Sequence, residues 1–143
     1  MLDVVESLPD DEFLRAFEAC EVSHTAWTHR CHIRLARLML QGRRFDEALN
    51  MTRSGIQKLN ARHQTPEGLE RGYHETVTHA WLKIVAATMK HHGHESDSRA
   101  FCDKHPQLMS SKLLRLYYTR ERIITLEAKR EFVEPDIAPL PTL

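Results

Sequence analysis

The chain has 143 residues and a mass of 16.7 kDa, which is the size of one ordinary domain. Its 20 lysine and arginine residues balance its 20 aspartate and glutamate residues, so the zero formal charge at pH 7 argues against nucleic acid or an anionic bilayer as a partner. No stretch approaches the roughly 18 apolar residues that a membrane-spanning helix needs. We therefore expect a single globular domain over residues 1–143, without a membrane or nucleic-acid partner.

The cysteines and the first residues of the chain indicate the compartment. Cys20, Cys31 and Cys102 are odd in number, and no two of them form a Cys-x-x-Cys pair, so a disulfide framework is not expected. The first residues are acidic and lack the basic start and long apolar run of a secretory signal. Both features favour a reducing compartment, and we expect a cytoplasmic protein.

Apolar residues recur at steps of three and four along most of the chain, which is the spacing of amphipathic helices. Proline, glycine and capping residues divide this pattern into segments. The expected helices are one that starts after Ser7–Asp10, one from the cap candidates at 21–25 to Gln41, one from near Arg44 to the break at 64–68, one from about Tyr73 to His92 with Gly93 as its stop, and a short one at about 97–102.

The C-terminal part is less regular. Residues 110–129 are predicted either as one helix broken near Thr119 or as two shorter helices. Three prolines among the last ten residues favour an extended tail over residues 133–143. No run alternates like a strand and no repeat is present, so the fold class is all-α: one compact domain of five to seven helices with a Pro-rich tail.

Two histidines of the second expected helix point to a site. At about 100° per residue, His29 and His32 lie with apolar residues such as Ile33, whereas Arg34 and Arg37 lie on another side. The two histidines are three residues apart and therefore share one helix face. We expect both rings to point toward the core.

The fourth expected helix supplies a third inward histidine. There the angles place His74 and Thr78 on the apolar side, and Thr76 and His79 on the opposite, outward side. Glu75 lies at the boundary between the two faces. The helix angles thus place residues that are neighbours in sequence on different faces of the helix.

Three inward imidazoles beside a carboxylate match the ligands of a divalent transition metal such as Zn, Fe, Mn or Ni. This pattern predicts a metal centre formed by His29, His32 and His74. Glu75 would be a fourth ligand or the acid/base group of a metal-dependent enzyme, and Thr78 would hydrogen-bond an inward group in support.

Buried histidines are also often satisfied by carbonyl or hydroxyl groups and have no further role. The alternative is therefore a metal-free helical module that binds a ligand or a protein, with a structural histidine cluster. In both interpretations Tyr73 and Trp27 would line a small pocket beside the histidines. The chain lacks the usual nucleophile, phosphate and dinucleotide motifs, so no reaction is predicted, although a small-molecule substrate remains open.

A third interpretation is an obligate partner of another enzyme, to which the Pro-rich tail docks. It leaves a protein partner or a homo-oligomer open, and neither composition nor motif spacing decides between them.

Three segments, residues 27–36, 72–78 and 132–141, together resemble an uncharacterised family of small, mostly bacterial helical proteins. The shared features are a Thr/Asp-His-x-x-His element, a Tyr-His-Glu-Thr-x-Thr element and a Pro-Asp-x-x-Pro-Leu-Pro tail. The family has no assigned reaction, so the resemblance implies where a site lies and not what it does. The matching positions are His29, His32, Tyr73, His74, Glu75, Thr76 and Thr78.

Overall fold

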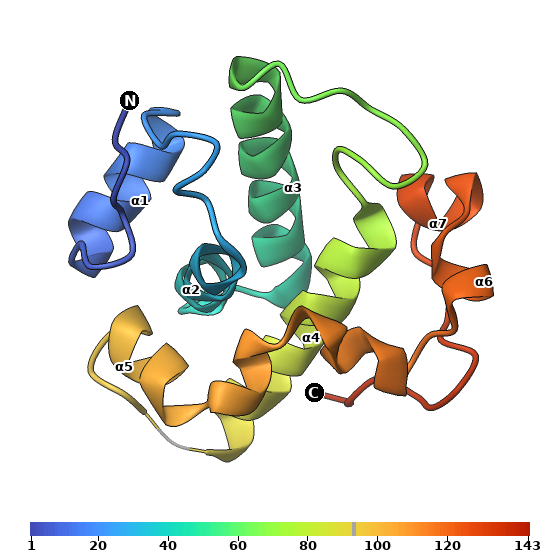
Figure 1. Cartoon of the computed structure of the whole chain (residues 1–143). Coiled ribbons are helices and arrows are strands. Elements are labelled where there is room, and N and C mark those ends of the chain that lie inside the picture. Colours follow the sequence, from blue (N-terminus) through green and yellow to red (C-terminus); the bar gives the residue numbers. More distant parts are fainter. Residues whose placement is uncertain (93) are drawn as a thin grey trace.

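The fold is all-helical, as predicted. A computed structural model describes residues 1–92 and 94–143, and within these ranges it contains seven α-helices, two short 3-10 helices and no β-sheet (Figure 1). The predicted stop at Gly93 lies outside the described residues. In the same ranges, no helix combines the length and apolar character needed to cross a bilayer.

The helices follow one another with short connections, except for residues 19–28 between α1 and α2 and residues 63–74 between α3 and α4. Their bounds are α1 Asp10–Glu18, α2 His29–Leu40, α3 Phe45–Arg62, α4 Glu75–His91, α5 Ser98–Lys104, η1 Pro106–Met109, η2 Ser111–Leu116, α6 Arg120–Ile123 and α7 Leu126–Arg130.

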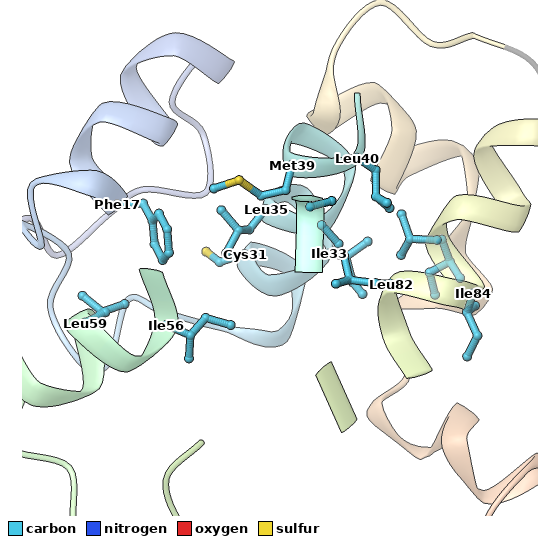
Figure 2. Close-up of a cluster of buried hydrophobic side chains, with 14 of the residues drawn as sticks. Phe17, Cys31, Ile33, Leu35, Met39, Leu40, Ile56, Leu59, Leu82 and Ile84 are labelled. Atoms are coloured by element: carbon cyan, nitrogen blue, oxygen red, sulfur yellow. The ribbon is translucent and has the colours of Figure 1, made fainter. Parts of the chain in front are cut away.

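Helix α2 is the centre of the molecule. It packs against α1, α3, α4 and α5, and Figure 1 shows it end-on between its neighbours. Its apolar side chains meet those of the surrounding helices in one core (Figure 2). The cysteines Cys20, Cys31 and Cys102 are buried in this core and free. Removal of apolar surface from water, at about 25 cal/mol per Å², is the main force that holds these helices together. The position of α2 determines which groups can line an internal site.

Helix α2 begins later than the predicted start at 21–25. Its first residue is His29, and the Thr28 hydroxyl accepts a hydrogen bond from the N–H of Cys31 at 3.4 Å as the N-cap. Residues 21–25 do not cap the helix. Instead, the main chain of Leu2 donates a hydrogen bond to the Glu21 carbonyl and accepts one from the N–H of Ser23. The extended N-terminal segment thus holds residues 21–23 outside a helix.

Arg34 and Arg37, which the helix angles place on a different side from the histidines, are not on a solvent face. Arg34 is fully buried, and its guanidinium donates hydrogen bonds to Ser98 Oγ at 2.7 Å, to Asp10 Oδ1 at 3.1 Å and to main-chain oxygens of residues 5–8. Arg37 is buried as well. The physical reason is that helices surround α2, so its polar side must be satisfied internally by charged hydrogen bonds.

The outward face predicted for the fourth helix is also covered. Thr76 is fully buried, and its hydroxyl donates to the Ala128 carbonyl at 2.7 Å. His79 is partly buried and stacks on Phe132, with ring centroids 3.9 Å apart. Because α7 and the segment after it pack on this side of α4, a face that reads as polar in sequence became an interior face.

Residues 131–143 form no helix or strand, and they are attached to the helices by main-chain groups. The N–H of Val133 donates to Thr76 Oγ1 at 3.1 Å, and the Tyr118 hydroxyl donates to the Val133 carbonyl at 2.7 Å. The N–H of Ile137 donates to the Tyr117 carbonyl at 2.9 Å. These bonds place the end of the chain against α4 and η2.

The Arg34 network yields a stability prediction. Arg34→Met should lower the free energy of unfolding by about 3 kcal/mol or more, because it leaves the carboxylate of Asp10 and several carbonyl groups without their partner. Urea denaturation followed by circular dichroism measures the change. Arg62→Met is the control, since Arg62 is exposed, and a change below about 0.5 kcal/mol is expected there. Equal effects of the two substitutions would contradict the role given to Arg34.

Candidate functional site

The main pocket has a volume of about 810 Å³ and lies between α2, α3, α4 and the segment from η2 to α6. Pockets of roughly 300–1,000 Å³ are typical of small-molecule sites. It reaches the surface at Ser111, Arg115, Arg120 and Ile137, which are all exposed. Much of the wall is apolar, and the apolar lining residues include Ile33, Ala36, Ile56, Val77, Trp81, Leu82, Leu114, Ile123, Ile124 and Ile137.

The structure brings the three predicted histidines to this one pocket. His29 and His32 reach it from α2, and His74 reaches it from the residue that precedes α4. Tyr73 and Thr78 line it as well. Glu75 and Trp27, which were predicted to belong to the same site, are not among the lining residues.

Both ring nitrogens of His74 are occupied. Nδ1 accepts a hydrogen bond from the N–H of Val77 at 3.2 Å, so the imidazole is the N-cap of α4. Nε2 lies 2.9 Å from the carbonyl oxygen of Ile123. A carbonyl only accepts, so Nε2 carries the proton and donates it. Burial lowers the pKa of His74, which keeps this ring neutral.

His29 has one ring nitrogen in use. Its Nε2 lies 2.8 Å from the Leu108 carbonyl and donates to it, which attaches the first turn of α2 to η1. The ring also packs edge-on against Trp81, with centroids 4.8 Å apart. His29 is therefore part of the pocket wall and holds two elements together.

His32 is the histidine that remains open to the pocket. No hydrogen bond joins its ring nitrogens to another group within residues 1–92 and 94–143. The ring is accessible, yet burial, with a smaller effect from neighbouring His29, lowers the pKa of His32 to about 4. The ring lines the pocket and is exposed, while protein atoms packed near it, including those of Trp27, desolvate it. At pH 7 His32 is thus neutral and offers one donor and one acceptor.

These hydrogen bonds do not fit a metal ion shared by the three rings. A metal ligand needs an unprotonated nitrogen with a free lone pair, and His74 has none. Coordination by His74 would break either the cap of α4 or the bond to Ile123. In the part of the chain that the structure describes, no group of three or more histidine, cysteine, aspartate or glutamate side chains is arranged to hold a metal ion.

Glu75 lies in a different environment from the histidines. Its carboxylate accepts hydrogen bonds from Arg53 at 2.8 and 2.7 Å and from the Tyr73 hydroxyl at 2.8 Å. The hydrogen-bonded Arg53 is the main cause that lowers the pKa of Glu75. The pair borders a second, smaller hollow of about 510 Å³ that also contains Lys129. An ionised carboxylate with these partners is not a free acid or base for the main pocket.

The remaining predicted residues have supporting positions. Trp27 stacks on Phe17 with ring centroids 5.1 Å apart and meets the His32 ring edge-on at 5.4 Å, so it lies behind the pocket wall. The Thr78 hydroxyl donates to the His74 carbonyl at 3.0 Å, within the first turn of α4.

Part of the lining was not predicted from sequence. Thr52 and Asn60 come from α3, and Leu114 and Tyr118 come from the irregular segment after η1. The apolar periodicity of α3 was visible, but nothing in the sequence indicated which side of α3 faces the histidines. The 3-10 turns have no periodicity by which their facing could be found.

No family model, curated protein or solved structure matches this chain. The family resemblance carried by the three motifs therefore stays a prediction. The residues of the site are therefore assigned from the distances and hydrogen bonds of the structure.

The double role of His74 can be tested by stability. His74→Ala should lower the free energy of unfolding by about 2 kcal/mol, because a lost N-cap costs about 1 kcal/mol and a lost hydrogen bond to a carbonyl costs about the same. His74→Asn keeps a capping acceptor and should recover about half of the loss. His91→Ala, at an exposed position near the other end of α4, is the control. If all three variants unfold alike, His74 does not connect the two elements.

The lowered pKa of His32 predicts a dependence of stability on pH. The folded-state pKa of about 4 lies below the ordinary value of 6.5, so the unfolded chain takes up the proton first as the pH falls. The stabilisation is complete above pH 6.5 and is lost as the pH falls toward 4. Urea denaturation should show a larger loss of stability from pH 7 to pH 5 in the native chain than in His32→Gln. Equal losses of stability in the two proteins would contradict the lowered pKa of His32.

Proposed function

We propose that this protein is a metal-free helical module that binds one small, mainly apolar molecule in the pocket between α2, α3 and α4. The observation that carries the proposal is an apolar pocket of about 810 Å³ with one neutral, unpaired imidazole, His32, on its wall. Small-molecule sites typically combine an apolar lining with a few polar groups that orient the ligand.

The polar groups of the wall support an apolar occupant. The hydroxyl of Thr52 donates to the Ala48 carbonyl at 2.7 Å, and Tyr118 and Thr78 likewise donate to main-chain carbonyls. These side chains already have partners, so they present little unmet polarity to a ligand. Within residues 1–92 and 94–143, no aspartate or glutamate lines the pocket. Binding would mainly transfer apolar surface out of water.

The wall also has the fixed connections expected of a preformed site. The His74 ring joins α4 to Ile123, and the His29 ring joins α2 to Leu108. Both lie between elements that are distant in sequence and that border the pocket. A wall held in this way costs little conformational entropy when a ligand binds.

The proposal is tested with the uncharged fluorescent probe N-phenyl-1-naphthylamine. The native chain should bind about one equivalent with increased probe fluorescence. Val77→Trp, which fills the pocket, should weaken binding at least about tenfold, or about 1.4 kcal/mol. The matched control is Val4→Trp, because Val4 is exposed and lies outside the pocket. Equal binding by both variants would contradict a site in this pocket.

Metal content provides a second measurement for the same protein. Untagged chain reconstituted with Zn, Fe, Mn or Ni should retain well below one equivalent after gel filtration. One equivalent in the native chain that is lost in both His32→Gln and His74→Gln would instead support the metal centre and overturn the metal-free proposal.

A further inference from the structure

The pocket contains few side chains that could hydrogen-bond a ligand. Most of its polar side chains already have partners inside the protein. Those without a side-chain hydrogen bond in residues 1–92 and 94–143 are His32, Asn60, Trp81, Ser111 and Arg115. Only Arg115 among them carries a charge, and it is exposed at the rim.

The surroundings of His32 decide which groups it can receive. The ring packs against Trp27 in a T-shaped arrangement and is exposed to the pocket, and desolvation lowers its pKa to about 4, so it is neutral at pH 7. An ionised carboxylate placed beside it would lose hydration without gaining a counter-charge, which is costly in an apolar site. An ammonium group would also lose hydration without gaining a counter-charge, because no carboxylate among residues 1–92 and 94–143 lines the pocket.

A neutral imidazole suits an uncharged polar group well. It has one N–H donor and one lone-pair acceptor, so it can accept from a hydroxyl or donate to a hydroxyl or carbonyl oxygen. An unpaired polar group of the protein also distinguishes between ligands. A ligand without a hydrogen-bonding partner for this group displaces the water that hydrates it and forms no hydrogen bond in exchange.

The charged residues at the pocket rim are compatible with an uncharged ligand. Arg120 is already paired with Glu70 at 2.7 Å, and both side chains are exposed. Such an exposed pair is weak, so both Arg115 and Arg120 could attract an acid at the rim, but each would do so in solvent, where an ion pair contributes about 0–1 kcal/mol.

We infer that the pocket selects an uncharged apolar molecule with a hydroxyl or carbonyl group, and that His32 hydrogen-bonds this group. The inference rests on the proposed binding function and deepens it by naming the ligand class. His32 is then the specificity-determining residue of the pocket, whereas His29 and His74 are parts of its wall.

The test compares three molecules with the same ten-carbon chain and different head groups: 1-decanol, decanoate and decylammonium. Each is titrated at pH 7.4, below its micelle concentration, against the native chain loaded with N-phenyl-1-naphthylamine, and binding is repeated by calorimetry without the probe. Decanol should displace the probe at a concentration at least about tenfold lower than either ion. This result would show that the pocket selects against charge.

Substitutions then identify the residue that makes the selection. His32→Phe keeps a ring of similar size and removes both nitrogens, so decanol affinity should fall about fivefold, the value of one hydrogen bond of about 1 kcal/mol, while probe affinity changes less than about twofold. His91→Phe, outside the pocket, should change neither. A variant with lost structure would lower both affinities together, which separates a structural effect from lost recognition.

Three results would overturn the inference. If the three molecules displace the probe at equal concentrations, the pocket does not distinguish between their head groups. Decanoate as the tightest ligand, with its advantage lost in Arg115→Gln, would assign an acid bound at the rim. If neither the probe nor decanol binds the native chain by fluorescence or calorimetry, the proposed binding function itself fails, and this outcome differs from the first two.

Discussion

The His74 ring holds together two parts of the chain that are 49 residues apart, because Nδ1 caps α4 and Nε2 donates to the carbonyl of Ile123. This one interaction fixes where α4 begins and brings the segment around α6 over the pocket. It also determines the chemistry of the site. With both nitrogens engaged and burial holding its pKa down, His74 has no lone pair to give to a metal and no charge to give to an acid.

The position of α2 explains the rest of the arrangement. A helix surrounded by four others cannot have a polar side in water, so Arg34 supplies an internal polar network that attaches the N-terminal segment and α5 to it. On another side, His29 and His32 extend toward α4 and α3. One ring is hydrogen-bonded to η1, and the other is unpaired. The same helix thus supplies the anchor of the core and the open hydrogen-bonding group of the pocket.

The sequence was sufficient for the helical class and for the inward facing of His29 and His32, because apolar periodicity determines which face of an isolated helix turns inward. The sequence did not show that α2 and α4 pack together, and His74 lies before α4 as its N-cap, not within the helix as predicted. It failed where the environment of a helix is not solvent on one side. Thr76 and His79 were placed outward, because a helix wheel carries no information about which elements pack on each face, and α7 and the segment after it cover this side of α4. The sequence also could not show that the carbonyl of Leu108, in η1, and that of Ile123, at the end of α6, would accept hydrogen bonds from ring nitrogens. That information decides between a metal centre and a neutral pocket.

The most direct test of a neutral, metal-free pocket is the ¹⁵N chemical shift of the histidine ring nitrogens at pH 7, with and without one equivalent of Zn²⁺. We predict that His74 is neutral with the proton on Nε2, that Nε2 of His29 carries a proton, that His32 is neutral, and that zinc shifts none of the three rings. If zinc moves the signals of His29, His32 and His74 together, or if the proton of His74 lies on Nδ1, the hydrogen bonds that define the pocket are not those of the protein in solution.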